Sequence, residues 1–306
     1  MLTILICTHN RVDLLSKVLM SLNTAIRPKN LDLQIRVIPN ACTDDTIKYL
    51  VDYQRIQQSN QWIPLDWAEE SKPGKSYALN FGIPLVKSKY IAFVDDDHRI
   101  DCDYLQEISS AIGKYPEVSM FCGRILPDWD GWEPAWAHEE GEYAVYPLPV
   151  PHYDQGMDEK LITLSGPLPG GGNLIINKSV FNTVGEFSTT LGPQGHNLGG
   201  GEDSDFVTRA LKSGCAIQYM PGVVQHHYVD TERFNLLYVL RKSYQRSCSV
   251  TIVKRVKRSI PPKYLWRKLF SYFMNIIFSL EWRKTRFYLV RVAATIGEIS
   301  GYIKNA

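Results

Sequence analysis

The chain has 306 residues, of which 44% are hydrophobic and 22% are charged, a composition that excludes an intrinsically disordered protein and allows one large or two small globular domains. Its net charge of +2 conceals an uneven distribution. The stretch from Arg233 to the C-terminus carries 16 Lys and Arg residues against two acidic ones, whereas the first 232 residues carry 18 against 30. An acidic body with a basic tail predicts an anionic partner for the tail.

The cysteines and the N-terminus indicate the compartment. The six cysteines are scattered and form no CxxC pair. The N-terminal residues run directly into a strand pattern and include no basic leader. We therefore expect free thiols, no signal peptide and a cytoplasmic protein.

The first half of the chain alternates strand and helix patterns. Apolar strand patterns and helical spacings of apolar residues follow one another at 2–7, 13–26, 33–38, 44 onwards, 72–86, 91–94 and 103–114. This order predicts a Rossmann-like, mostly parallel α/β sheet with helices on both faces. Because ligands bind outside the carboxyl ends of parallel strands, we expect Thr8, Asn10 and Asn40 to lie on one rim with the acids that follow residue 94.

Three consecutive carboxylates, Asp95, Asp96 and Asp97, follow the apolar strand at 91–94. Three neighbouring acids repel one another unless a cation neutralises them. Their hard oxygen ligands suit Mg²⁺ or Mn²⁺, ions that usually accompany phosphates. The triplet alone leaves a solvated acidic loop as the alternative.

The second half of the chain is less periodic. Residues 124–172 are rich in Pro, Gly and Trp, and their aromatic side chains would line a sugar-binding surface or pack in the core of a loop. The glycines at 199–201 then precede Glu202 and Asp203 and a helix expected over about 204–213. Polyglycine permits a sharp bend and places the acids at a helix N-terminus, although ordinary capping produces the same pattern.

Six segments carry a family resemblance: 3–11, 39–46, 74–82, 93–97, 172–187, and 201–205 with Arg209, Gly214, Pro221 and His227. In this order they resemble the motifs of the family 2 glycosyltransferases, inverting enzymes of the GT-A fold. The resemblance covers about residues 1–245. It implies a GT-A catalytic domain at 1–232, with a nucleotide-sugar-binding half at 1–123 and an acceptor-binding half at 124–232, followed by a basic helical tail at 233–306.

The resemblance implies a metal-dependent hexosyl transfer, with inversion, from a nucleotide-sugar donor to a saccharide or lipid-linked saccharide in polysaccharide or glycolipid synthesis. Asp97 is expected to bind Mn²⁺ or Mg²⁺, and Asp95 to contact the ribose or the metal. Asp96 is expected to point away, since neighbouring side chains at a strand end alternate. His227 is expected to complete the metal site, with His226 as an alternative.

The donor site is expected to draw on Thr8, Asn10, Arg11, Asn40, Lys75, Asp95 and Asp96. Lys75 would neutralise diphosphate charge or lie at the surface. Pro39 stands where the family usually has an acid that holds the base or ribose, which leaves the nucleotide open, with UDP as the default. Lys178 replaces the usual arginine of the acceptor segment. By the resemblance Asp203 is the base and Glu202 the alternative; their repulsion would raise one pKa.

The basic tail contains an amphipathic segment at 236–258 and an apolar run at 269–280. That run is about half as long as the roughly 20 residues that a spanning helix needs. Aromatic and aliphatic residues flanked by Lys and Arg are typical of a helix in the interface of an anionic membrane. We expect a peripheral protein on the cytoplasmic face; packing on the catalytic domain or a dimer contact is the alternative. The acidic body argues against nucleic acid.

Two other functions compete. A metal-dependent nucleotidyltransferase would share the metal and diphosphate site, but it needs neither the base after the glycine-rich turn nor the acceptor segment. A catalytically inert nucleotide- or carbohydrate-binding protein would need neither the metal carboxylates nor the base. The presence of all these features favours the glycosyltransferase.

Overall fold

The computed structural model describes residues 1–191, 201–254 and 260–304. The chain divides into two compact units. The first, here named the α/β unit, comprises Met1–Asp128 and Pro151–Tyr228; the second, the helical unit, comprises Trp129–Val150 and Val229–Ala306. The division into catalytic domain and tail at residue 232 stays a prediction.

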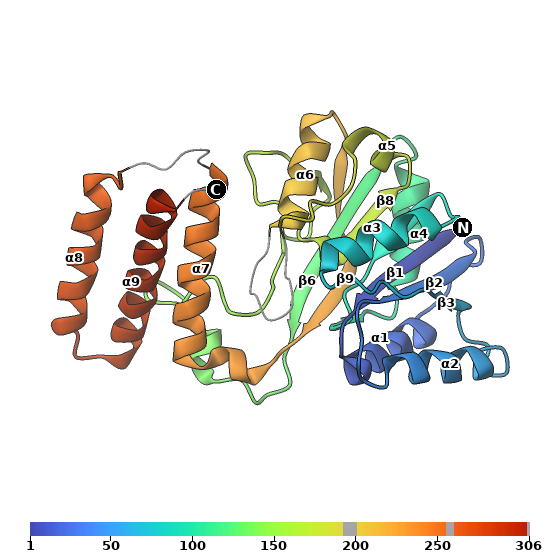
Figure 1. Ribbon diagram of the computed structural model, residues 1–306, viewed down its shortest axis with the longest axis horizontal. Coiled ribbons are helices and arrows are strands. Elements are labelled where there is room, and N and C mark those ends of the chain that lie inside the picture. Colours follow the sequence, from blue (N-terminus) through green and yellow to red (C-terminus); the bar gives the residue numbers. More distant parts are fainter. Residues whose placement is uncertain (192–200, 255–259, 305–306) are drawn as a thin grey trace. The chain divides into compact units, whose positions relative to one another are not determined.

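One mixed sheet forms the centre of the α/β unit (Figure 1). In the described part of the chain its order is β3-β2-β1-β4-β8-β6-β9-β5, with β7 paired to β9. Strands β3, β2, β1 and β4 are parallel, as are β6 and β9, whereas β8, β5 and β7 join antiparallel. The strands are β1 (Leu2–Thr8), β2 (Leu33–Pro39), β3 (Leu65–Trp67), β4 (Tyr90–Phe93), β5 (His98–Ile100), β6 (Met120–Asp128), β7 (Lys160–Leu161), β8 (Leu174–Asn177) and β9 (Ile217–Tyr228).

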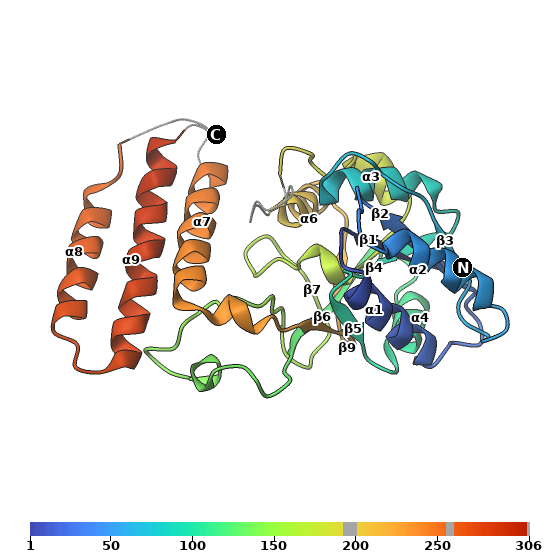
Figure 2. The ribbon, with the colours of Figure 1, turned by 60° about the horizontal axis from the view of Figure 1, so that its bottom comes forward.

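Helices cover both faces of this sheet because its strands are apolar on both sides. Helices α1 (Val12–Thr24), α2 (Thr46–Ile56) and α4 (Tyr104–Lys114) pack on one face, and α3 (Lys75–Leu85), α5 (Val180–Val184) and α6 (Glu202–Lys212) on the other (Figures 1 and 2). Within β1, Leu2, Ile4 and Ile6 join the first core and Leu5 joins the second. The fold is therefore three-layered.

The helical unit contains the 3₁₀ turns η1 (Ala135–His138) and η3 (Thr231–Phe234) and the helices α7 (Leu236–Lys254), α8 (Lys263–Ile277) and α9 (Trp282–Ile303). Helix α9 lies between α7 and α8 (Figure 2). Two glycines let α9 approach α7 closely: a Cβ on Gly297 would lie 2.2 Å from the carbonyl oxygen of Tyr244, and one on Gly301 would lie 2.7 Å from that of Cys248. None of the described helices is both long and apolar enough to span a membrane.

The three tryptophans at 129–136 differ in burial. Trp129 and Trp136 pack against Phe234 in a small core of the helical unit, so they form the core of a loop. Trp132 is 82% exposed. All six cysteines are free, as expected.

Candidate active site

A cavity of about 280 Å³ opens at the carboxyl ends of β1, β2 and β4, where a parallel sheet is expected to bind ligands. It brings together most of the side chains that the sequence singles out. Its lining includes Thr8, Arg11, Asn40, Lys75, Asp95, Asp96, Asp97 and His227. Asn10, Glu202 and Asp203 lie outside this lining.

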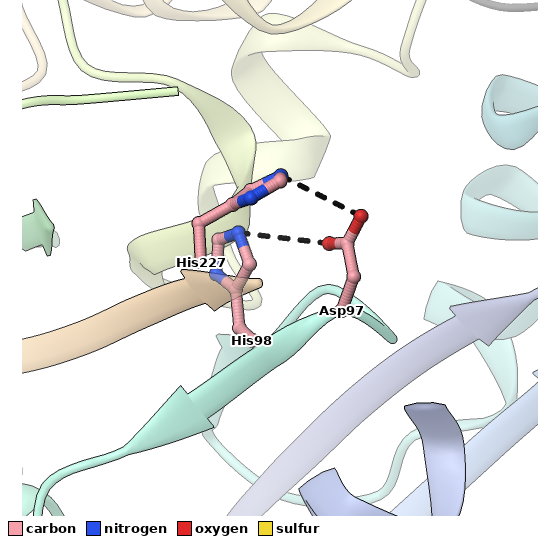
Figure 3. A group of neighbouring side chains, drawn as sticks. All are labelled: Asp97, His98 and His227. Carbon is pink, nitrogen blue, oxygen red and sulfur yellow. Dashed lines mark ion pairs between the residues drawn. The ribbon is translucent and has the colours of Figure 1, made fainter. Parts of the chain in front are cut away.

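Asp97 faces two histidines rather than one (Figure 3). His98 lies opposite His227 in the antiparallel register of β5 and β9, so both imidazoles reach the same carboxylate. Nε2 of His98 is 3.8 Å and Nε2 of His227 3.5 Å from the Asp97 carboxylate oxygens. The ligand atoms of the three residues all lie within 4.8 Å of one another.

A buried amide orients the ring of His98. The Gln225 amide nitrogen lies 3.2 Å from the carbonyl oxygen of Phe93 and 2.7 Å from the hydroxyl of Tyr104, so its oxygen faces His98 Nδ1, at 2.5 Å. An amide oxygen only accepts hydrogen bonds, so Nδ1 carries a hydrogen and Nε2 is the ring nitrogen that faces Asp97. Histidine ligands of metals are commonly oriented in this way. Sequence reasoning missed His98, although it directly follows the acidic triplet.

His227 is oriented similarly. Its Nδ1 lies 2.6 Å from the backbone carbonyl oxygen of Tyr228, which directs Nε2 towards Asp97. His226, the alternative ligand, is instead 2.7 Å from Asp101, because successive residues of a strand point to opposite faces. The set of one carboxylate and two imidazoles fits a divalent cation of borderline softness.

Asn40 shapes the loop that precedes α3. Its amide nitrogen donates to the carbonyl oxygens of Glu70 and Lys72, and its Oδ1 accepts from the backbone N–H of Gly74 at 2.7 Å. Gly74 has a φ of 135°, which disfavours residues with a side chain. These contacts place Lys75 at the first position of α3, next to the cavity.

Lys75 and Asp95 form an ion pair of 2.8 Å. Burial alone would lower the pKa of Lys75, but Asp95, Asp203 and Glu202 together raise it well above its usual value. Burial would conversely raise the pKa of Asp95, and Lys75 and His98 instead hold it well below its usual range. Lys75 is therefore a permanently charged group at the site.

Asp96 points into the site, contrary to the expectation from strand alternation, which is wrong here. Nη1 of Arg11 lies 3.0 Å from Oδ1 of Asp96 and 3.1 Å from Oδ2 of Asp97. The chain turns directly after β4, so the alternation of an extended strand no longer applies. Burial and the neighbouring Asp97 raise the pKa of Asp96 to about 6.

Glu202 and Asp203 begin α6. Asp203 shares a small adjoining hollow with Lys75 and Asp95, so the predicted base lies next to the main cavity. Among the described residues, Oδ1 of Asp203 and Oε2 of Glu202 are buried without a hydrogen-bond partner. Burial and repulsion from Asp203 raise the pKa of Glu202 to about 7.

Two further residues that the sequence singles out, Asn10 and Lys178, form hydrogen bonds with backbone groups. Oδ1 of Asn10 accepts from the backbone N–H groups of Thr43 and Asp44, at 2.6 and 3.2 Å. Nζ of Lys178 donates to the carbonyl oxygens of Pro84 and Val86 at the end of α3. Both contacts are ones that stabilise loops.

Comparison with known proteins bears on this arrangement. The sequence matches the description "Glycosyl transferase family 2" over residues 3–185, more than half of the chain. The chain belongs to this family. This glycosyltransferase has a curated relative in Haloferax volcanii, glucosyl-dolichyl phosphate glucuronosyltransferase, which is 25% identical over 122 residues. The match covers 40% of this chain and 37% of the relative.

Solved structures share the fold. S. aureus TarS 1–349 in complex with UDP-GlcNAc superposes with a TM-score of 0.55 at 14% identity, over 98% of this chain and 90% of that one. The mannosyltransferase PcManGT from Pyrobaculum calidifontis, in complex with GDP-Man and Mn²⁺, superposes with a TM-score of 0.56 at 16% identity. This match covers 96% of this chain and 86% of that one. Both structures confirm the expected GT-A fold, and the family match confirms that the protein is a glycosyltransferase.

Proposed function

We propose that this glycosyltransferase moves a sugar, with inversion, from a nucleotide-diphospho-sugar to a hydroxyl of a saccharide or lipid-linked saccharide, and that it requires a divalent cation. The observation that carries the proposal is the convergence of Asp97, His98 and His227 beside the Lys75–Asp95 pair. Structural neighbours solved with UDP-GlcNAc, or with GDP-Man and Mn²⁺, support it.

Asp97, His98 and His227 would hold the cation, and two nitrogen ligands favour Mn²⁺ over Mg²⁺, which prefers oxygen. When bound, such an ion acts as a Lewis acid that neutralises charge on the diphosphate. Asp95 keeps one oxygen on Lys75 and directs the other towards His98, at 3.9 Å. It is thus positioned for the metal or the ribose.

The protein's own groups complete the chemistry. The ammonium of Lys75 and the guanidinium of Arg11 border the cavity and would bind diphosphate oxygens. The carboxylate of Asp203 would take the proton of the acceptor hydroxyl. At the same time the oxygen of that hydroxyl bonds to the anomeric carbon. The bond from that carbon to the phosphate oxygen breaks, and its electron pair leaves with the nucleoside diphosphate. Glu202 is the alternative base, and its pKa of about 7 suits a general base near neutral pH. Asp203 is preferred on geometry, since it lines the hollow that also contains Lys75 and Asp95.

The test is donor binding followed by product analysis. UDP-, GDP-, dTDP- and CMP-sugars are compared for thermal stabilisation with and without Mn²⁺; a ligand at 100 times its Kd stabilises by about 2.7 kcal/mol. We expect a manganese-dependent shift with one nucleotide, and release of nucleoside diphosphate with an acceptor. Release of a sugar 1-phosphate, with transfer of the nucleoside monophosphate group, would identify a nucleotidyltransferase. Donor binding without turnover, unaffected by Asp203→Asn, would identify an inert binding protein.

We further propose that the protein associates peripherally with an anionic membrane on its cytoplasmic face. Helix α8 exposes an apolar stripe at helical spacing, consisting of Trp266, Phe270, Phe273 and Ile277, each 53–66% exposed. The helix carries Lys263, Arg267 and Lys268 and no acidic residue. An apolar face flanked by cations is typical of a helix in the membrane interface. The dolichyl phosphate in the name of the Haloferax volcanii relative accords with a lipid-linked acceptor.

Truncation before α8 would also remove α9, which packs on α7, so point substitutions are the sharper test. A variant with Trp266, Phe270 and Phe273 changed to Ser should no longer sediment with vesicles that contain phosphatidylserine. Trp132→Ser removes a tryptophan that is 82% exposed elsewhere and should leave sedimentation unchanged. If the triple variant sediments like the wild type, α8 is not the docking face.

A further inference from the structure

The helical unit contains a second cavity, of about 510 Å³. Helices α7 and α9 form two of its walls, Tyr264 of α8 contributes at one side, and residues 146–149 close it further. All of its lining residues belong to the helical unit. None of the roles assigned above uses this cavity.

The α7 wall is polar where a helix in a bundle is normally apolar. The residues that line the cavity recur at helical spacing along one face: Val239, Lys242, Ser243, Arg246, Ser247, Val250 and Thr251. This spacing usually marks the stripe that packs into a core. Two cations and three hydroxyl groups on such a stripe indicate that the face is built to contact something polar.

The cavity is strongly cationic. Lys242 and Arg246 line it from α7, and Arg291 lines it from α9. In the described parts of the chain, none of these three side chains lies within ion-pair distance of a carboxylate. Glu298, the one acid among the described residues of the lining, is paired with Lys268 at 3.1 Å. Burial, with Arg233 and Arg246 nearby, lowers the pKa of Lys242, as expected for a cation among cations.

Apolar side chains line the same space as these cations. They include Leu148, Val239, Val290 and Ala294, so an inorganic ion alone would leave much of the surface without a partner. A ligand that combines an anionic head with an apolar chain would satisfy both kinds of wall. Arginine and lysine together with hydroxyl donors suit a phosphate group.

We propose that this cavity binds the phosphate group of an amphiphilic molecule, with Lys242, Arg246 and Arg291 as its cationic ligands. A lipid headgroup and inorganic phosphate share this phosphate chemistry, and the apolar side chains of the lining favour the lipid. The proposal goes beyond sugar transfer and does not depend on the donor site.

The experiment is calorimetric titration of the full chain at physiological salt, with three probes. These are dihexanoyl phosphatidic acid below its micelle concentration, dihexanoyl phosphatidylcholine and inorganic phosphate. We expect phosphatidic acid to bind best, and Arg246→Gln and Lys242→Gln each to raise its Kd about tenfold, the effect of losing one charge-assisted hydrogen bond. Equal binding of inorganic phosphate would assign the site to free phosphate.

The matched control is Arg241→Gln, on the same helix and with the same loss of charge but outside the cavity lining. It should leave the Kd unchanged, and Arg246→Lys should retain most of the affinity, which separates lost charge from misfolding. If Arg241→Gln weakens binding as much as Arg246→Gln, the attraction is only general charge and the proposal fails. It also fails if neither phosphatidic acid nor phosphate binds.

Discussion

Substitution of Gly172 by alanine tests whether the site depends on a close approach of backbone to side chains. A Cβ at this position would lie 2.6 Å from Cε1 of His98 and 2.7 Å from Oδ2 of Asp95. Favourable van der Waals contact begins at about 3.5 Å, so the imidazole and the carboxylate must move by about 1 Å. The backbone conformation is ordinary, since Gly172 has no positive φ. The effect is therefore purely steric.

The magnitude follows from this overlap. Overpacking of this kind costs about 1–3 kcal/mol, and a domain of 150–250 residues loses about 2–4 °C in melting temperature per kcal/mol. We expect the Tm of Gly172→Ala to fall by about 2–12 °C. Because His98 faces Asp97, a displacement of about 1 Å should also reduce activity by about 10²-fold. Most of that loss should come from weaker donor binding in the presence of Mn²⁺.

The neighbouring glycines distinguish this reasoning from general fragility. A Cβ on Gly171 would lie 2.1 Å from Oδ1 of Asp203, so Gly171→Ala should lower turnover more than donor affinity. Gly170 has nothing within 4 Å of its Cβ position and a φ of −78°, so Gly170→Ala should match the wild type.

The assays are thermal melts by circular dichroism, donor titrations with Mn²⁺, and turnover measured well below each Tm. The reasoning is refuted if Gly170→Ala is as damaging as Gly172→Ala. It is equally refuted if Gly172→Ala keeps the Tm and donor affinity of the wild type.

Three other perturbations probe individual groups. Asp97→Ala should abolish the Mn²⁺-dependent part of donor binding, because it removes the carboxylate that both imidazoles face. An unchanged donor affinity in the presence of Mn²⁺ would refute the assignment of Asp97 as a metal ligand. Lys75→Met should destabilise the apo protein by about 1–3 kcal/mol, since it leaves Asp95 without its cation. Lys72 is exposed and serves as the control; a loss of stability of similar size in Lys72→Met would contradict this explanation. The pKa of Glu202 is raised from 4.5 to about 7 in the folded chain. The folded chain therefore binds the carboxyl proton more tightly than the unfolded chain does. The free energy of unfolding should fall as the pH rises from about 4.5 to about 7. Glu202→Gln should therefore flatten the difference in urea midpoint between pH 5 and pH 8 and raise the value at pH 8; an identical pH dependence in both proteins would show that Glu202 is not the group responsible.

Local patterns determined much of the α/β unit. The predicted strand at 2–7 and helix at 13–26 correspond to β1 and α1 within two residues, because period-two and helical spacings are properties of consecutive residues. The rim position of Asp95 and Asp97 followed similarly, since both come directly after an apolar strand.

Only the tertiary structure decided which distant residues meet. His98 joins the site because the three-residue strand β5 pairs with β9 in the register that places it opposite His227, and a strand so short carries no readable alternation. Asp96 turns inward because the chain leaves the sheet after Phe93. The cavity of the helical unit was equally invisible, since it needs α7, α9 and residues 146–149 brought together. Sequence patterns describe neighbours along the chain, whereas these contacts depend on strand register and helix packing between segments far apart in it.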